Sequence, residues 1–221
     1  MDIFEQHEAF EIEALDRMNS ARLLDPVVFG GGTMLRLCYE LNRYSADLDF
    51  WLMKPVPHET YFDSFHRAFG ADYEITDSQM KHFSLLFELR SSAYPKRLKI
   101  EIRRELKAWN YRKTIAFSPV RSKQVLVNAH TLEQTMENKV QAFLDRNEIR
   151  DCFDIEFLIR RGIDLPFSDK RQAAELQKRI AAFKDVDFRV KLGSIVEKEI
   201  RDYYIENRFS FLAGKLAAMS S

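Results

Sequence analysis

The sequence is poor in cysteine and histidine, the residues that mark many metal and redox proteins. Its two cysteines, Cys38 and Cys152, have the spacing of neither a zinc knuckle nor a redox pair, and both lie in apolar stretches, so we expect buried free thiols. The five histidines are scattered without metal-ligand spacing. The sequence shows no Ser-His-Asp order and no Cys-His pairing, so it does not indicate a nucleophilic triad.

An excess of one charge and long apolar runs are also missing. Lysine plus arginine and aspartate plus glutamate each total 34, so the chain as a whole does not attract polyanions and any such site must be local. No apolar run approaches the roughly 20 residues that span a bilayer. The start of the chain, Met1–Glu5, lacks the basic residues and apolar run of a signal peptide. We therefore expect a cytoplasmic protein with no membrane partner.

The composition is that of a globular protein, with 46% hydrophobic residues and 221 residues in which to bury a core. Apolar periodicity predicts an α+β protein. We expect an N-terminal domain, 1–128, with a mixed β-sheet and flanking helices, followed by a helical domain, 129–221. The expected helices are Ile3–Leu24, Met34–Leu41 and His58–Phe69, with others starting at Thr131, Asp169, Phe188 and Ile195. The expected strands are Val27–Phe29, Asp47–Met53, Tyr73–Thr76, Phe83–Arg90 and Arg97–Arg103, with weaker candidates at Thr114–Phe117 and Val125–Val127.

Two aspartates stand two residues apart in one of these strands. Asp47 and Asp49 should leave the same face of the sheet, because side chains alternate along a strand, while Leu48 and Phe50 point into the core. Paired carboxylates provide the oxygen ligands that Mg²⁺ or Mn²⁺ takes beside substrate phosphates. The pair is therefore a candidate metal site.

A run of glycines precedes the aspartates. Gly30-Gly31-Gly32 joins an expected strand to an expected helix, which Thr33 is predicted to cap. Glycines let a ligand approach the backbone closely, and a helix N-terminus offers unpaired N–H groups to an anion. Gly31, Gly32 and Thr33 are thus candidate nucleotide-binding residues, although a tight turn without a ligand also uses glycine.

The glycine turn, short helix and Asp-x-Asp strand together resemble the signature of the polymerase-beta-like nucleotidyltransferase superfamily. Within it, residues 31–37 (Gly-Gly-Thr-Met-Leu-Arg-Leu) and 43–50 (Arg-Tyr-Ser-Ala-Asp-Leu-Asp-Phe) resemble the AbiEii/AbiGii toxin family. The resemblance implies a nucleotidyltransferase-like sheet that carries the metal acids Asp47 and Asp49, and a helical domain that closes over a nucleoside triphosphate. It also implies an RNA acceptor, such as the 3′ end of tRNA, and a cognate antitoxin.

The same resemblance assigns roles to residues further along the chain. Glu101, in the alternating run 98–102, is the candidate third acid, as a metal ligand or a base. The equal alternative is that Glu101 is a surface glutamate paired with Lys99 or Arg103. Lys139 is implicated in holding the triphosphate and Asp154 in completing the site. Asp151 is the alternative acid, or a salt-bridge partner of Arg146 or Arg150. Without the resemblance, these residues suggest a solvated charged face.

Ser45 lies just before the aspartates. In the family, a serine or threonine at this place contacts the metal acids and can be a target of inactivating phosphorylation; the ordinary alternative is a hydroxyl that caps the turn. Cations concentrate in 96–113 around Trp109 and Tyr111. They suit either a polynucleotide backbone with a stacked base or two solvated strand faces.

These residues predict a metal-dependent nucleotidyltransferase that moves a nucleotide from a nucleoside triphosphate to an acceptor hydroxyl, with RNA as the first choice of acceptor. Two other functions fit the same sequence. One is transfer to a small molecule or a protein hydroxyl, and the other is a catalytically silent scaffold that binds a partner. Intact acids favour an enzyme.

Overall fold

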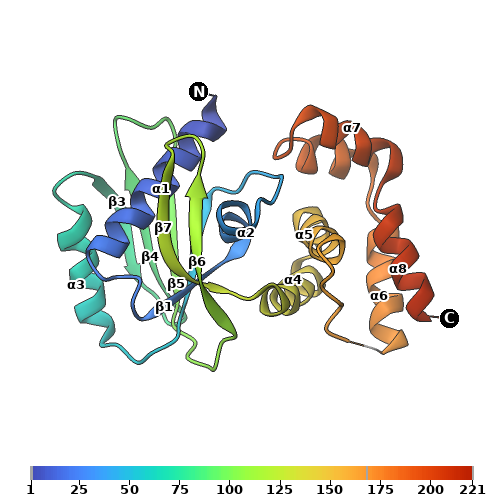
Figure 1. The fold of residues 1–221 in the computed structure, drawn as a ribbon, viewed down its shortest axis with the longest axis horizontal. Coiled ribbons are helices and arrows are strands. Elements are labelled where there is room, and N and C mark those ends of the chain that lie inside the picture. The colour runs from blue at the N-terminus through green and yellow to red at the C-terminus, as the bar shows by residue number, and fades with distance from the viewer. Residues whose placement is uncertain (1, 168, 221) are drawn as a thin grey trace. The chain divides into compact units, whose positions relative to one another are not determined.

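The structure is a computed structural model that describes residues 2–167 and 169–220 of the 221-residue chain. The chain forms two compact units. The first comprises the segment up to Glu40 together with Tyr44–Thr131, and the second comprises Leu41–Arg43 together with the segment from Leu132 onward. A mixed sheet with helices forms the first unit and helices form most of the second (Figure 1), so the predicted α+β class is confirmed.

The first unit is built on a seven-stranded sheet with the order β3-β4-β5-β2-β1-β7-β6. Strands β2 and β5 are parallel, as are β1 and β7, and the other neighbours are antiparallel, so the sheet is mixed as predicted. The strands are β1 (Val27–Gly30), β2 (Asp47–Leu52), β3 (Glu74–Met80), β4 (Ser84–Arg90), β5 (Leu98–Arg103), β6 (Tyr111–Ser118) and β7 (Lys123–His130).

Helices α1 (Ile3–Ser20) and α3 (His58–Phe69) cover the apolar face of this sheet. The ring of Phe65 in α3 stacks on Phe87 of β4 with 3.7 Å between centroids, and Phe10 of α1 stacks on Tyr94 at 4.6 Å. Phe10, Phe65 and Phe87 are fully buried. Aromatic side chains of this size supply much of the burial that holds helices on a sheet.

Helix α2 (Gly31–Tyr39) begins earlier than the sequence predicts. Gly30 occupies the N-cap position and donates no side-chain cap, so the prediction that Thr33 caps this helix is wrong. The glycine backbone lets the helix start directly after β1, which places Thr33 inside the first turn. Its hydroxyl is thereby free to bond outside the helix.

Strands β6 and β7 are longer than the weak candidates in the sequence. They form a hairpin in continuous antiparallel register from Tyr111 opposite His130 to Ser118 opposite Lys123. The apolar side chains Ile115, Phe117 and Leu126 are about half exposed on it. The alternation that reveals a half-buried strand is therefore weak here, and pairing between the strands extends them.

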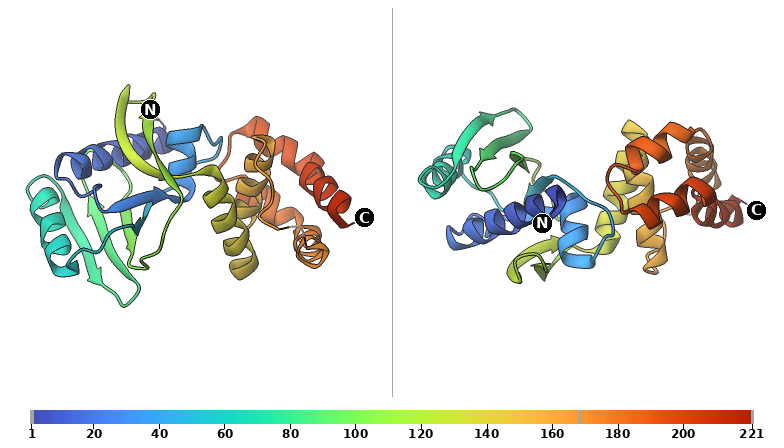
Figure 2. Two further views of the ribbon diagram at one scale, coloured as in Figure 1. Left: turned by 60° about the horizontal axis from the view of Figure 1, so that its bottom comes forward. Right: turned by 90° about the horizontal axis from the view of Figure 1, so that it is seen from above.

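The second unit contains the C-terminal helices, which Figure 2 shows in yellow to red from two further directions. They are α4 (Leu132–Arg146), α5 (Ile149–Arg160), α6 (Lys170–Ala181), the π-helix η1 (Asp187–Leu192), α7 (Lys198–Asn207) and α8 (Ser210–Ser220). Buried Phe143, Phe188 and Phe209 lie in its core. The predicted helix at Phe188 is a π-helix, and the one expected from Ile195 begins at Lys198. Among the described helices, none is long and apolar enough to cross a membrane.

Candidate functional site

The two aspartates of β2 lie on one accessible face of the sheet. Burial alternates along the strand, with Leu48 and Phe50 fully buried and Asp47 and Asp49 partly exposed between them. This alternation follows from the strand pleat, which turns every second side chain to the same side. The apolar residues anchor the strand in the core, so the two carboxylates are held next to each other at the surface.

The glycine turn packs directly against one of these carboxylates. Gly30 pairs with Asp49 across β1 and β2, and the next residue, Gly31, has a φ of +78°. A Cβ added to Gly31 would lie 2.5 Å from Oδ2 of Asp49, so the carboxylate would have to shift to make room for it. Only glycine fits here for two reasons, the left-handed backbone and the contact. Gly32 follows it, buried in the first turn of α2.

Thr33 ties α2 to the acid strand. It is fully buried, and its Oγ1 donates a hydrogen bond of 2.7 Å to the backbone carbonyl of Asp47. Oγ1 also lies 3.4 Å from the buried carboxyl of Glu11. Burial and the nearby Glu8 charge raise the pKa of Glu11 well above its usual value. The Thr33 hydroxyl thus has a partner inside the unit, a role that sequence reasoning missed.

Strand β5 brings a third carboxylate to the same face. Its parallel register with β2 sets Lys99 opposite Asp47 and Glu101 opposite Asp49. Nζ of Lys99 lies 2.9 Å from Oε2 of Glu101. Partial burial would raise the pKa of Glu101, but the hydrogen bond and charge of Lys99 outweigh it and hold the pKa below its usual value. Glu101 therefore lies beside Asp49 and is also paired with Lys99.

The donor set on this face suits a hard divalent cation. Within 2–167 and 169–220, no three aspartate, glutamate, histidine or cysteine side chains form a group that could hold a metal by themselves. Mg²⁺ does not require such a group, because it binds through one or two carboxylates and takes its other ligands from water and substrate phosphates. Asp47 and Asp49 match that requirement, and the metal role of Glu101 stays a prediction.

Ser45 lies in the segment that leads into β2. This segment is anchored on both sides of the serine: the Tyr44 ring stacks on Phe4 at 4.1 Å, and Nε2 of His7 is 2.9 Å from the carbonyl of Ala46. Ser45 itself is partly exposed. The serine is thus held two residues before Asp47 at a place that solvent can reach.

Lys139 and Asp154 meet in the second unit, in a buried cluster with Arg43. The guanidinium of Arg43 donates to both oxygens of Asp154 at 2.6 and 2.7 Å, and Nζ of Lys139 lies 2.6 Å from the same carboxylate. Asp154 is fully buried. Burial would raise the pKa of Asp154, but the charges of Arg43 and Lys139 lower it below its usual value. Sequence reasoning missed Arg43, because it stands 111 residues from its partner.

Asp151 extends the same cluster. Arg146 donates to its two oxygens at 2.6 and 2.7 Å, and Lys139 lies 3.5 Å away. Asp151 is fully buried, so the alternative reading of these acids as part of a solvated face is wrong. Its pairing with Arg146 is the salt bridge that the sequence suggested. Arg43, Lys139 and Arg146 thus all contact these two carboxylates.

The cations of 96–113 do not form one surface. Lys99 and Arg103 lie on the acid face, where Arg103 covers the Trp51 ring at 5.2 Å. Trp109 is buried, and its Nε1 donates to the carbonyl of Leu52 at 3.1 Å. Trp109 therefore supports the end of β2 and does not offer an open ring to a base.

The sequence and the fold were compared with those of known proteins. The family model described as nucleotidyl transferase AbiEii toxin, type IV toxin-antitoxin system, matches residues 13–218. No curated protein matches the sequence. JHP933 from Helicobacter pylori is similar in structure, with 22% identity, a TM-score of 0.57 and coverage of 96% of this chain and 94% of that chain. MenT4, the nucleotidyltransferase toxin Rv2826c from Mycobacterium tuberculosis H37Rv, has 16% identity, a TM-score of 0.55 and coverage of 96% and 88%. At these identities the two structures show a shared fold.

Proposed function

The chain belongs to the AbiEii family of nucleotidyltransferase toxins, and from that premise we propose that it transfers a nucleotide from a nucleoside triphosphate to a hydroxyl of RNA, at the 3′ end of tRNA. The observation that carries the proposal is a pair of accessible carboxylates on one strand face, Asp47 and Asp49, of which Asp49 lies against the Gly31 turn. A type IV toxin-antitoxin family also implies an antitoxin as a partner.

Asp47 and Asp49 would hold Mg²⁺, or Mn²⁺ in its place, together with phosphate oxygens of the triphosphate. A divalent cation there supplies neutralisation of the charge that develops on the reacting phosphate. The backbone of Gly31 and Gly32 approaches closely because neither residue has a side chain, and the first turn of α2 directs N–H groups to the phosphates. The α-phosphate would thus be held for in-line attack by the acceptor hydroxyl, with pyrophosphate leaving.

Glu101 has a different role in this proposal. Because Lys99 lowers its pKa, its carboxylate is ionised at neutral pH and is a weak base. A carboxylate whose pKa is lowered holds a proton less tightly, which suits a ligand or an orienting group better than a proton acceptor. We assign Glu101 to the metal site as the neighbour of Asp49, with Lys99 as the cation that fixes its position.

Lys139 is proposed to bind a phosphate of the triphosphate. Its side chain is 10% exposed, and its ammonium group is held by the carboxylates of Asp151 and Asp154. Asp154 is fully buried, so it acts by holding Lys139 and Arg43 in place. Asp154 is therefore a positioning residue in this proposal.

Ser45 is proposed as a site of inactivation by phosphorylation. A phosphate there adds nearly two negative charges close to Asp47 and repels the incoming triphosphate. Ser45→Glu should lower the transfer rate about tenfold, equivalent to roughly 1.4 kcal/mol. Ser45→Ala should retain the wild-type rate, because it adds no charge. A rate for Ser45→Glu equal to that of Ser45→Ala would contradict this role.

The function is tested by incubating the protein with labelled nucleoside triphosphates, Mg²⁺ and total RNA. Label should appear in RNA, and Asp49→Asn should reduce it by roughly 100-fold or more. Asp63→Asn, which changes an exposed aspartate of α3, is the matched control and should retain activity. Label found only in protein or in a small molecule would overturn RNA as the acceptor and leave the two aspartates as metal acids.

A further inference from the structure

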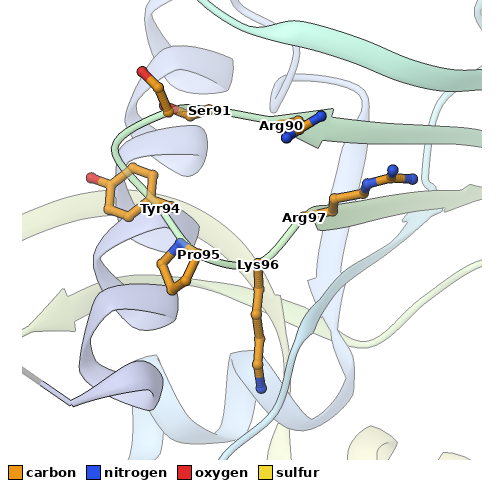
Figure 3. A pocket seen from close by; sticks show the side chains of 7 residues that line it. Arg90, Ser91, Tyr94, Pro95, Lys96 and Arg97 are labelled. Carbon is orange, nitrogen blue, oxygen red and sulfur yellow. The ribbon is translucent and has the colours of Figure 1, made fainter.

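The loop between β4 and β5 forms a pocket that none of the roles above uses. It encloses about 440 Å³, and its lining includes Arg90, Ser91, Ser92, Tyr94, Lys96 and Arg97 (Figure 3). The lining contains three cations and three hydroxyls, and no acidic side chain of the described residues contributes to it. This is the donor composition of an anion site.

Two of these cations lie at the open end of the β4–β5 pair. Leu89 pairs with Leu98 in antiparallel register, and Arg90 and Arg97 are the residues that follow outward. Both belong to the pocket lining. An anion in the pocket would therefore have two guanidinium groups as donors.

Two carboxylates outside the lining pair with the arginines of the pocket. Glu88 pairs with Arg97 at 2.7 Å, and Glu74 lies 3.8 Å from Arg90. Both arginines are more than half exposed, and exposed pairs of this kind contribute little. Lys96 has no carboxylate within ion-pair distance anywhere in the part of the chain that the structure describes.

The pocket lies next to the start of the strand that carries Glu101. Arg97 directly precedes β5 and stands two residues before Lys99. Lys99 stands opposite Asp47. In Figure 3 the Lys96 side chain points away from that of Arg97, and its Nζ lies 5.1 Å from the centre of the Phe4 ring. Phe4 stacks on Tyr44, which precedes Ser45.

We infer that the pocket of Arg90, Lys96 and Arg97 binds a phosphate group of the substrates, beyond the phosphate held at the Gly31 turn. The inference rests on the proposed function for the identity of the substrates. That phosphate belongs either to the nucleoside triphosphate or to the backbone of the acceptor RNA. Both sources present the same chemistry to two guanidinium groups and an ammonium.

The test uses the full chain carrying Arg90→Gln, Lys96→Gln and Arg97→Gln together. Binding of labelled tRNA and of ATP with Mg²⁺ is measured separately as a function of salt concentration. The triple variant should bind one of the two probes about tenfold more weakly, and the slope of log K against log salt should fall by roughly one to two. Loss in the tRNA arm identifies a backbone phosphate, and loss in the ATP arm identifies the triphosphate.

A matched control removes the same charge elsewhere in the first unit, by Arg22→Gln, Lys54→Gln and Arg67→Gln, all exposed. It should leave affinity and salt slope close to wild type. Equal effects of the two triple variants, or no effect of the pocket variant in either arm, would overturn the inference, as would a wild type that binds neither probe. Because binding is measured without transfer, a protein that labels no RNA but binds through this pocket would refute only the proposed function.

Discussion

Gly31 shows how a single residue determines whether the acid face can form. Its φ of +78° is strained for any other residue, and a Cβ would meet the Asp49 carboxylate at 2.5 Å. Gly162 offers a comparison, since its φ is +84° but open space surrounds its missing Cβ. A side chain at either position would strain the backbone, but only one at Gly31 would also meet Asp49.

Gly31→Ala should abolish most transfer activity, because it displaces Asp49, and should cost about 1–3 kcal/mol of stability from backbone strain. Gly162→Ala should cost about 1–2 kcal/mol and retain activity. Chemical denaturation and the transfer assay measure both effects. Normal activity in Gly31→Ala would show that the closeness of this turn to Asp49 does not matter for the reaction.

Local pattern predicted part of this site. The alternation of Asp47, Leu48, Asp49 and Phe50 was enough to expect two carboxylates on one face, because strand geometry is set locally. It was not enough to find Arg43, whose partner lies on a helix far along the chain. The catalytic roles of these side chains stay predictions, because the fold places groups without showing what they do.

At the scale of the element, the hydrogen bond from Thr33 links the first turn of α2 to the start of β2. Thr33→Val keeps the shape of the side chain but leaves the partly buried Asp47 carbonyl without this donor. We expect a loss of about 1–3 kcal/mol in the free energy of unfolding, together with lower transfer activity. Thr60→Val, at an exposed position of α3, should change stability by less than about 0.5 kcal/mol. Similar values for the two variants would remove Thr33 from the support of the acid strand.

Helices and strands were predicted well where their own apolar periodicity is strong. They were predicted poorly where strand pairing or a glycine run sets their first or last residue. α1, α3, β2, β4 and β5 follow from apolar patterns, whereas the largely polar β3 runs to Met80, past its predicted end at Thr76. The start of α2 does not, because a glycine run carries no periodicity that fixes the first helical residue. The hairpin of β6 and β7 was underestimated, since half-exposed apolar residues such as Ile115 and Leu126 blur its alternation.

At the scale of the whole molecule, Asp154 is the group on which acid stability should depend. Asp154→Asn leaves Arg43 and Lys139 without a shared carboxylate in a buried place, at a cost of about 3–5 kcal/mol at neutral pH. Because the folded-state pKa lies below the usual 3.8, the contribution of the carboxylate is fully present above pH 3.8 and is lost as the pH falls below it.

Denaturant titrations of wild type and Asp154→Asn at pH 7 and in the acid range measure this dependence. The difference in stability should be largest at pH 7 and should narrow below pH 3.8. The control is Asp202→Asn, which removes an exposed ion pair whose partners, Arg201 and Asp202, are 3.9 Å apart. It should change the free energy of unfolding by less than about 1 kcal/mol. A gap that is constant across the pH range would mean that Asp154 is not ionised in the folded protein.

The chain leaves the first unit after Glu40 and contributes Leu41–Arg43 to the second unit. It then returns to the first unit until Thr131, after which it belongs to the second unit. A gene that acquired its C-terminal helices from a relative through one crossover would therefore keep its own Arg43 while receiving a foreign Asp154. Such a hybrid keeps the buried ion pair only when the two parents carry matching residues at both positions. Arg43 and Asp154 should thus be inherited as a matched pair, although most of the gene lies between them.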